Sequence, residues 1–241
     1  MSRRIRITLA YDGTDYHGWQ LQRGLPTIQG TVEEIVSGIE GGPVRVEASG
    51  RTDAGVHAVA QVAAFTIENP IPPENLRRAM NRLLPASVRV LRVEETHAEF
   101  HPRFDALAKT YRYTIFRDEV CPPIEWRYVY HHPYPLDEAV MMAAARVYEG
   151  EHDFTAFAAA DHSGAEPASK VRTIFNSVLE REGNKLIYTV RGNGFLKHMV
   201  RNIVGTLIET GRGNVDWRTL PERSGRTAPA KGLTMVSVEY V

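Results

Sequence analysis

The stretch VRVEASGRTDAGVHAVAQVAAFTI, residues 44–67, indicates how the chain folds and where its chemistry lies. Apolar and polar residues alternate near both of its ends, which is typical of half-buried strands. The residues between these strands, SGRTDAGVH at 49–57, form a connection with Asp53 near its centre. Gly50 and Gly55 predict a backbone that has a positive φ or approaches another segment closely.

Two interpretations of Asp53 stand side by side. An Asp that follows a Thr in a glycine-containing turn often only hydrogen-bonds its own backbone. Arg51 and His57 lie within a few residues of Asp53, however, and loops carry a large share of catalytic and binding residues. The connection is therefore a candidate site that combines a carboxylate, a guanidinium and an imidazole.

Composition limits the class of protein. The chain has 241 residues, of which 43% are hydrophobic, so it can form one large domain or two modest ones. Cys121 is the single cysteine, which excludes an internal disulfide and favours a reducing compartment. The pattern shows no signal peptide and no membrane-spanning stretch, so we expect a cytoplasmic protein. With 29 basic and 29 acidic residues, any nucleic-acid site must be a local patch.

Hydrophobic periodicity in the first hundred residues predicts a strand, a helix, two strands, a helix and a strand. These six elements are expected at residues 4–9, 28–39, 44–48, 61–67, 73–84 and 88–93. Glycines follow the first predicted helix, and prolines flank the second. The order is that of a ferredoxin-like βαββαβ unit.

The same order of elements recurs in the rest of the chain. The corresponding patterns lie at residues 111–115, 136–147, 171–179, 186–190, 195–207 and 233–241. We therefore expect an α+β protein of two ferredoxin-like (RRM-like) halves, 1–105 and 106–241. Long connections at 117–135 and 152–170 are either decoration or parts that grip a large substrate.

Helices on one face of a four-stranded antiparallel sheet leave its other face free. Two such halves could join their sheets and leave a cleft between them, an arrangement that suits RNA recognition. This functional reading is an analogy at the level of the fold.

The last predicted helix contains a basic pair. Lys197 and Arg201 are spaced i, i+4, opposite an apolar stripe, and a solvated basic face is the simplest explanation. Gly205 is unusual, since glycine costs about 1 kcal/mol relative to alanine inside a helix. It would let another backbone come close, such as the loop that carries Asp53. We hypothesise that Arg201 pairs with Asp53 across the two halves and keeps the carboxylate ionised.

Other residues point to RNA or to a metal. Tyr111 is either a core residue or a platform on which a base stacks. His101 and Arg103 lie in FHPRF, which interleaves aromatic and basic residues. The residues that offer metal-ligand types are Asp12, Asp15, Asp53, His57, His97 and His101. Their spacing matches no HExxH arrangement, so we expect no metal.

Several motifs resemble those of one enzyme family. They are YDGT at 11–14, GWQ at 18–20, SGRTDAGVH at 49–57, KTYRY at 109–113, GFLKHMVRN at 194–202 and APAKGL at 228–233. With these motifs the chain resembles the tRNA pseudouridine synthase A family over nearly its whole length. The resemblance implies isomerisation of uridine to pseudouridine at tRNA positions 38, 39 and 40, in the anticodon stem-loop, by a homodimer without metal or cofactor.

The resemblance also implies roles for particular residues. Asp53 would be the catalytic nucleophile, and Arg51 would fill the space left by the flipped nucleotide. Tyr111 would stack on the target base, and Arg201 would hold Asp53. Lys197 matches a position where basic residues vary, and it is expected, like His101 and Arg103, to contact RNA.

Two other classes of function are carried as alternatives. A non-catalytic RNA-binding protein with paired recognition sheets predicts that Asp53→Asn leaves every function intact. A metal-dependent phosphoesterase predicts that a chelator abolishes activity.

Overall fold

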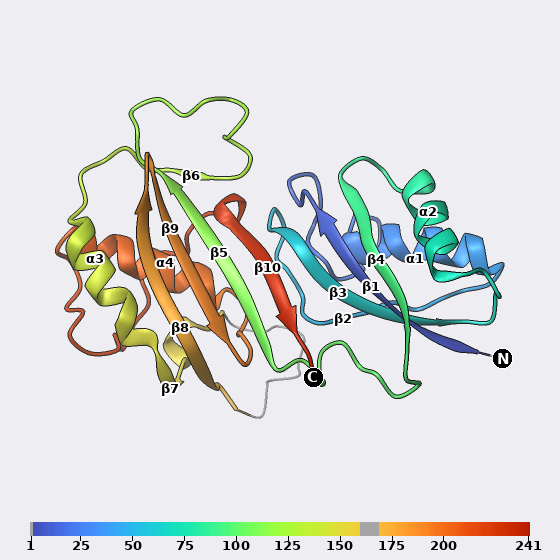
Figure 1. Cartoon of the computed structure of the whole chain (residues 1–241). Helices are drawn as coiled ribbons and strands as arrows, with labels where there is room; N and C mark the ends of the chain where they lie inside the picture. The colour runs from blue at the N-terminus through green and yellow to red at the C-terminus, as the bar shows by residue number, and fades with distance from the viewer. Residues whose placement is uncertain (1, 160–168) are drawn as a thin grey trace. The chain divides into compact units, whose positions relative to one another are not determined.

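The computed structural model describes residues 2–159 and 169–241. The chain divides into two compact units, Met1–Leu107 with Met235–Val241 and Ala108–Thr234 (Figure 1). Each unit combines helices with a mainly antiparallel sheet, so the protein belongs to the mixed α+β class. In the described part of the chain, no helix has both the length and the apolar character needed to cross a bilayer.

The first unit contains the elements that the sequence predicts, in the predicted order. They are β1 (Arg3–Tyr11), α1 (Ile28–Glu40), β2 (Glu47–Ala48), β3 (His57–Ile67), α2 (Pro73–Leu83) and β4 (Val88–Thr96). β1 lies between β3 and β4 and is antiparallel to both, while β2 pairs with β3. The strand order is therefore β4-β1-β3-β2. The predicted strand over 44–48 is shorter than expected, because only Glu47–Ala48 pair with β3.

The helices of the first unit begin and end at clear sequence signals. Thr27 caps α1, since its Oγ1 accepts a hydrogen bond of 3.2 Å from the N–H of Gly30. Gly41 ends α1 with a left-handed φ of 81°. α2 begins at Pro73, where the missing N–H has no helical partner to lose. α1 and α2 lie side by side (Figure 1).

The core of the first unit follows the two-residue period of its strands. On β1, Ile5, Ile7 and Leu9 are fully buried. Arg6 lies on the opposite face, and its Nε donates to Glu94 on β4 over 2.8 Å. The alternation therefore separates an apolar face from a face of paired charges.

From β5 to α4 the second unit has the predicted order of elements, with additional short elements. It contains β5 (Ala108–Phe116), β6 (Tyr130–His131), α3 (Glu138–Ala145), the 3-10 helix η1 (Arg146–Tyr148), β7 (Gly150–Asp153), η2 (Thr155–Phe157), β8 (Val171–Glu182), β9 (Lys185–Gly192), α4 (Met199–Gly211) and η3 (Ala230–Gly232). Its strands lie in the order β5-β9-β8-β7, and β6 pairs in parallel with β5. β10 (Leu233–Glu239) follows η3 and lies beside β3 in the first unit's sheet.

Helix α4 is the most deeply buried element of the second unit. Every residue of α4 except Arg201 and Glu209 is buried. Asn202 shows how the polar groups are satisfied: its Nδ2 donates to the carbonyl of Phe157 over 2.7 Å, and its Oδ1 accepts from Thr227 over 2.7 Å. The amide of Asn202 therefore joins α4 to two separate loops of its own unit.

The start of α4 differs from the sequence prediction. The apolar pattern begins at Phe195, but the helix begins at Met199. His198, just before it, has a left-handed backbone with φ of 63°, which a right-handed helix does not accommodate. Lys197 therefore lies in the preceding turn, and the expectation that Lys197 and Arg201 share a helical face is wrong.

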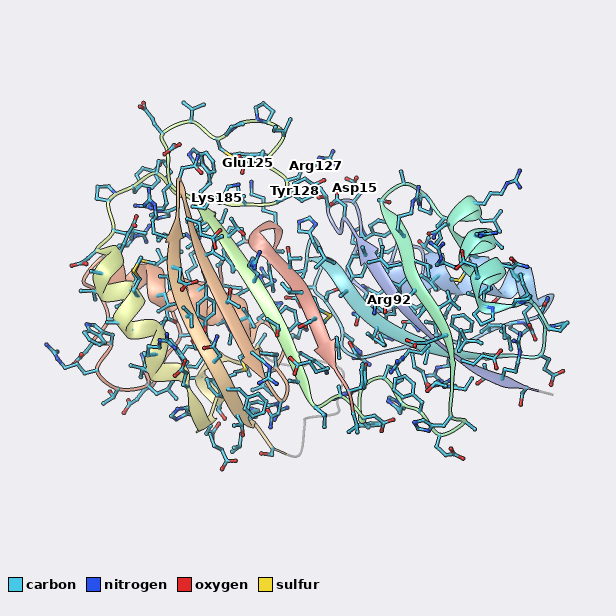
Figure 2. The ribbon with its side chains drawn as sticks, in the orientation of Figure 1. Asp15, Arg92, Glu125, Arg127, Tyr128 and Lys185 are labelled. Atoms are coloured by element: carbon cyan, nitrogen blue, oxygen red, sulfur yellow. The ribbon has the colours of Figure 1, made fainter. Side chains whose placement is uncertain are left out.

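The long connection at 117–135 is fastened to its own unit. Glu125 in this loop forms an ion pair with Lys185 at the start of β9 (Figure 2). Next to it, the Trp126 ring has the ammonium of Lys231 3.4 Å from its centroid, a cation–π contact. The second long connection, 152–170, includes η2, and its residues 160–168 lie outside the described residues.

A buried histidine lies where the 117–135 connection returns to the sheet. The two ring nitrogens of His132 face guanidinium groups: Nδ1 is 3.1 Å from Arg117 and Nε2 is 3.0 Å from Arg212. Burial lowers the pKa of His132, and the two positive charges lower it further. The ring is therefore neutral in the folded protein near pH 7.

We expect this histidine to make the fold less stable in acid. Because its pKa is lower in the folded state, the unfolded chain binds the proton first as the pH falls below about 6.5. Above that pH, protonation of His132 costs the fold nothing. Below it, the free energy of unfolding falls by at most about 1.4 kcal/mol per pH unit. Urea unfolding at pH 7.5 and 5.5 checks this: wild type should lose more stability than His132→Gln. Equal losses would contradict the explanation.

Candidate active site

Asp53 lies in the tight connection between β2 and β3 and is half-buried. The turn is closed by its main chain, because the N–H of Val56 donates to the carbonyl of Asp53 over 3.1 Å. Gly55 has a φ of 79°, which confirms the predicted left-handed position. The main chain thus contributes directly to fixing the backbone of the turn.

The start of this connection is tied to β3 by a buried polar pair. The hydroxyl of Ser49 donates to Oε1 of Gln61 over 2.5 Å, and Nε2 of Gln61 donates to the carbonyl of Gly50 over 2.8 Å. The N–H of Ser49 also donates to the carbonyl of Val62 over 2.8 Å. Ser49 and Gln61 are both fully buried, so the loop leaves the sheet from a fixed point.

The segment 12–19, which follows β1, supports the other side of the loop. The N–H of Trp19 donates to the carbonyl of Thr52 over 3.0 Å, and the N–H of Gly55 donates to the carbonyl of Tyr16 over 3.3 Å. These two bonds run in opposite directions between the same two pieces of backbone. They hold the residues on each side of Asp53.

Gly18 lets the two segments come this close. A Cβ at Gly18 would lie 2.5 Å from the carbonyl oxygen of Thr52 and 3.0 Å from the carbonyl carbon of Asp53. Its φ of 86° is also one that glycine adopts without strain. No other residue fits this position without moving the Asp53 loop.

A buried tyrosine completes the support. The hydroxyl of Tyr11 is 2.9 Å from Oγ1 of Thr52, and both residues are buried. Burial raises the pKa of Tyr11 to about 12, although hydrogen bonds with Thr52 and Gln61 oppose the rise. The hydroxyl therefore keeps its proton near pH 7 and holds the side chain that precedes Asp53.

His57 connects β3 to the same segment. Its Nδ1 accepts a hydrogen bond of 3.2 Å from the N–H of Gly13. Oδ1 of Asp12 is also 3.2 Å from Nδ1, and the same oxygen accepts from the N–H and the hydroxyl of Thr14. His57 is thus part of the framework of the loop.

Arg51 differs from its neighbours in being exposed. Thr52, the next residue, is buried, so the chain turns from solvent into the protein between these two positions. Arg51 thus lies at the solvent-accessible edge of the connection, two residues before Asp53.

In the second unit, Tyr111 and Tyr113 lie on one face of β5 but in different surroundings. Tyr113 is fully buried, and its hydroxyl donates to the carbonyl of Pro229 over 2.7 Å. Burial raises the pKa of Tyr113 well above its usual value. Tyr111 keeps 7% of its surface exposed and meets Phe195 edge to face, with 5.1 Å between ring centroids.

Arg201 is held by the segment that precedes η3. Its Nε donates to the carbonyl of Ala228 over 2.8 Å, and the N–H of Ala228 donates back to the carbonyl of Arg201 over 3.1 Å. One bond thus anchors the guanidinium at Nε, and the other joins the backbones of the two residues.

The structure confirms that another backbone comes close to Gly205, but this backbone is not the one that the sequence analysis suggested. A Cβ at Gly205 would lie 1.8 Å from the carbonyl oxygen of Arg226, so the backbone of 225–228 occupies this space. The expectation that the Asp53 loop fills it is wrong. The N–H of Gly225 also donates to Thr206 over 2.7 Å, which fixes the segment on α4.

The other predicted contact residues are exposed or partly exposed. Lys197 is exposed in the turn before α4, and its carbonyl accepts from the N–H of Ala159 over 3.0 Å. Arg103 is exposed, and His101 is partly buried, in a turn after β4. Among residues 2–159 and 169–241, no three His, Cys, Asp or Glu side chains gather as metal ligands would.

Sequence reasoning missed the residues that shape the site. Tyr11, Trp19 and Gln61 hold the Asp53 loop, and Ala228 holds Arg201. The unusual aromatic composition of YDGTDYHGWQ was a usable signal for the first two, since such a segment suits neither a core nor a plain loop.

Comparison with known proteins identifies the family. A family model described as tRNA pseudouridine synthase matches residues 7–105 and 144–241. A tRNA pseudouridine synthase A of Solibacter usitatus (strain Ellin6076) is 72% identical over 239 residues, covering 99% of this chain and 100% of that protein. One of Brevibacillus brevis is 44% identical over 246 residues, again covering 99% and 100%.

A likeness among solved structures is weaker. A chain of a Cbf5-Nop10-Gar1 complex aligns with 96% of this chain and 48% of its own length, at 13% identity and a TM-score of 0.42. The full-length relatives and the family model are sufficient by themselves: the chain belongs to the tRNA pseudouridine synthase A family.

Gly205→Ala should destabilise the second unit. The added methyl overlaps a main-chain carbonyl that hydrogen bonds hold in place, and such overpacking typically costs about 1–3 kcal/mol. We expect a fall of several degrees in the thermal unfolding midpoint, measured by circular dichroism.

Gly38→Ala is the matched control. Gly38 lies inside α1, and a Cβ there meets nothing within 4 Å, so its midpoint should stay unchanged or rise slightly. A Gly205→Ala protein as stable as wild type would show that the 225–228 segment is not fixed on α4.

Proposed function

We propose that this chain isomerises uridine to pseudouridine at positions 38, 39 and 40 of the tRNA anticodon stem-loop, with Asp53 as the nucleophile. Members of its family are isomerases that act on tRNA. The observation that carries the assignment to Asp53 is the rigid loop: main-chain hydrogen bonds on both sides fix the backbone from which the carboxylate projects.

The reaction needs a group that can act without a cofactor. The bond between N1 and C1′ breaks, the base rotates, a bond forms between C5 and C1′, and the C5 proton leaves. A carboxylate suits this sequence because it can attack covalently or accept a proton. Attack at C1′, attack at C6 and removal of a sugar proton are the three roles open to Asp53.

Arg51 suits the accompanying base flipping. A target uridine that is stacked in the stem-loop must leave the stack, at a cost of a few kcal/mol. Arg51 is exposed, long and charged, and it lies two residues from Asp53. We assign to it the space that the extruded nucleotide leaves.

Residues of the second unit complete the proposal. Tyr111 would stack on the target base, since 7% of its surface stays exposed whereas Tyr113 on the same face is fully buried. Arg201 would hold the Asp53 carboxylate, and the contacts of its Nε with Ala228 would orient it for that role. Lys197, His101 and Arg103 would contact RNA.

The finer organisation of the protein is part of the same proposal. We propose that 1–105 and 106–241 are ferredoxin-like halves, supported by the strand order β4-β1-β3-β2 in the first unit and β5-β9-β8 in the second. We further propose a cytoplasmic homodimer that works without a cofactor.

Release of label from tRNA tritiated at uridine C5 tests the function directly. Pseudouridine formation releases this tritium, whereas RNA binding alone and phosphoester hydrolysis do not. Wild type should release it with a chelator present. No release, or release that the chelator abolishes, would favour one of the two alternatives.

Asp53→Asn should bind tRNA with nearly unchanged affinity and lose turnover by more than about 10³-fold. Phosphate contacts elsewhere supply most of the binding, so the loss is confined to chemistry. Filter binding and tritium release measure the two quantities. Asp216→Asn, which removes the same charge from an exposed residue paired with Arg218, is the control and should behave as wild type. A large loss of affinity in Asp53→Asn would mean that Asp53 is structural.

A further inference from the structure

Phe104 is exposed on a short turn that follows β4. Its relative exposure is 74%, in a unit whose other phenylalanines, Phe65 and Phe100, are buried. Single exposed apolar residues are common, so exposure alone has no functional meaning. The contacts that hold the ring in this position are what distinguish it.

The turn 101–105 is held by its own hydrogen bonds. Nδ1 of His101 accepts from the N–H groups of Arg103 and Phe104, over 3.1 and 3.4 Å. The main chain of His101 exchanges two bonds with Asp105: its N–H donates to the carboxylate over 2.9 Å, and its carbonyl accepts over 3.1 Å.

The turn is also anchored to its unit. Tyr240 follows β10 and belongs to the same unit, and its hydroxyl donates to the carbonyl of Pro102 over 2.7 Å. Pro102 itself is buried, and its ring fixes the backbone. The aromatic ring of Phe104 is therefore presented on a preorganised support, and little conformational entropy is lost when a ligand covers it.

The surroundings of the ring are those of a nucleic-acid contact. The imidazole of His101 lies against it, with 4.3 Å between centroids and 38° between planes. The guanidinium of Arg103 is 5.7 Å from the ring centroid and is itself exposed. An aromatic surface next to a solvent-accessible cation offers a nucleobase a stacking partner and its phosphate a counter-charge.

We propose that Phe104 is a stacking platform for an unpaired base of the tRNA, with Arg103 contacting an adjacent phosphate. This inference rests on the proposed function. His101 is then a positioning residue, because its Nδ1 supports the backbone of Arg103 and Phe104. The main contact of FHPRF with RNA is thus proposed to be Phe104, whereas the sequence prediction named His101 and Arg103 as the contact residues.

The test measures binding of unmodified tRNA in an Asp53→Asn background, where no turnover interferes. Phe104→Ala and Phe104→Leu should each raise Kd by about 5- to 150-fold, because both remove the π-face. Phe104→Trp should bind within about threefold of the parent, and its added tryptophan fluorescence should be quenched by tRNA. Unfolding midpoints should not change, since the side chain is exposed.

Leu83→Ala is the matched control, because Leu83 is another exposed apolar residue of the same unit, with 57% exposure. It should leave Kd unchanged. Equal affinity of Phe104→Ala and its parent would overturn the proposal. A difference in oligomeric state between Phe104→Ala and its parent, measured by sedimentation, would also overturn the proposal. The ring would then be covering a second copy of this chain.

Two variants of His101 separate positioning from direct contact. Asn can place an acceptor near the position of Nδ1, so His101→Asn should keep most of the affinity that His101→Ala loses. Equal losses in both would contradict the positioning role. Failure of the catalytic proposal is distinguishable, because it shows as absent tritium release by wild type whatever the Kd values are.

Discussion

Two main-chain hydrogen bonds, from Trp19 to Thr52 and from Gly55 to Tyr16, fix the loop that carries Asp53. The rest of the first unit is arranged around them. The supporting segment follows β1, and the loop that carries Asp53 ends where β3 begins. The buried amide of Gln61, on β3, holds the start of this loop through the carbonyl of Gly50. A reactive carboxylate gains rate from being held in place before substrate arrives, because little reorganisation is then needed during reaction. Backbone contacts hold the turn from which the Asp53 side chain projects.

The second unit uses the same device for Arg201. α4 is buried except at Arg201 and Glu209, so almost its whole surface is engaged in packing. The missing side chain of Gly205 admits the backbone of 225–228, and Ala228 at the end of that segment meets the guanidinium. In both units, a glycine allows one backbone to position a residue on another segment to which we assign a role in the reaction.

Periodicity predicted the order of the main helices and strands, because their buried faces are visible in the local sequence. It failed where a single backbone conformation decides: the apolar residues before α4 continue the helical pattern, but the left-handed His198 interrupts the helix and leaves Lys197 outside it. The motif around Asp53 was visible as a candidate site. Its supports were not, because Tyr11 and Thr52 are 41 residues apart, and pairing at that separation is set by the sheet register.

The central claim is that close backbone packing against Gly18 positions Asp53 for chemistry. The most direct test compares Gly18→Ala with Gly24→Ala, since both glycines have a positive φ but only the first meets another backbone. Single-turnover rates with unmodified tRNA should fall about 10- to 100-fold in Gly18→Ala, with Kd nearly unchanged, and stay near wild type in Gly24→Ala. Equal rates in the two variants would contradict the account.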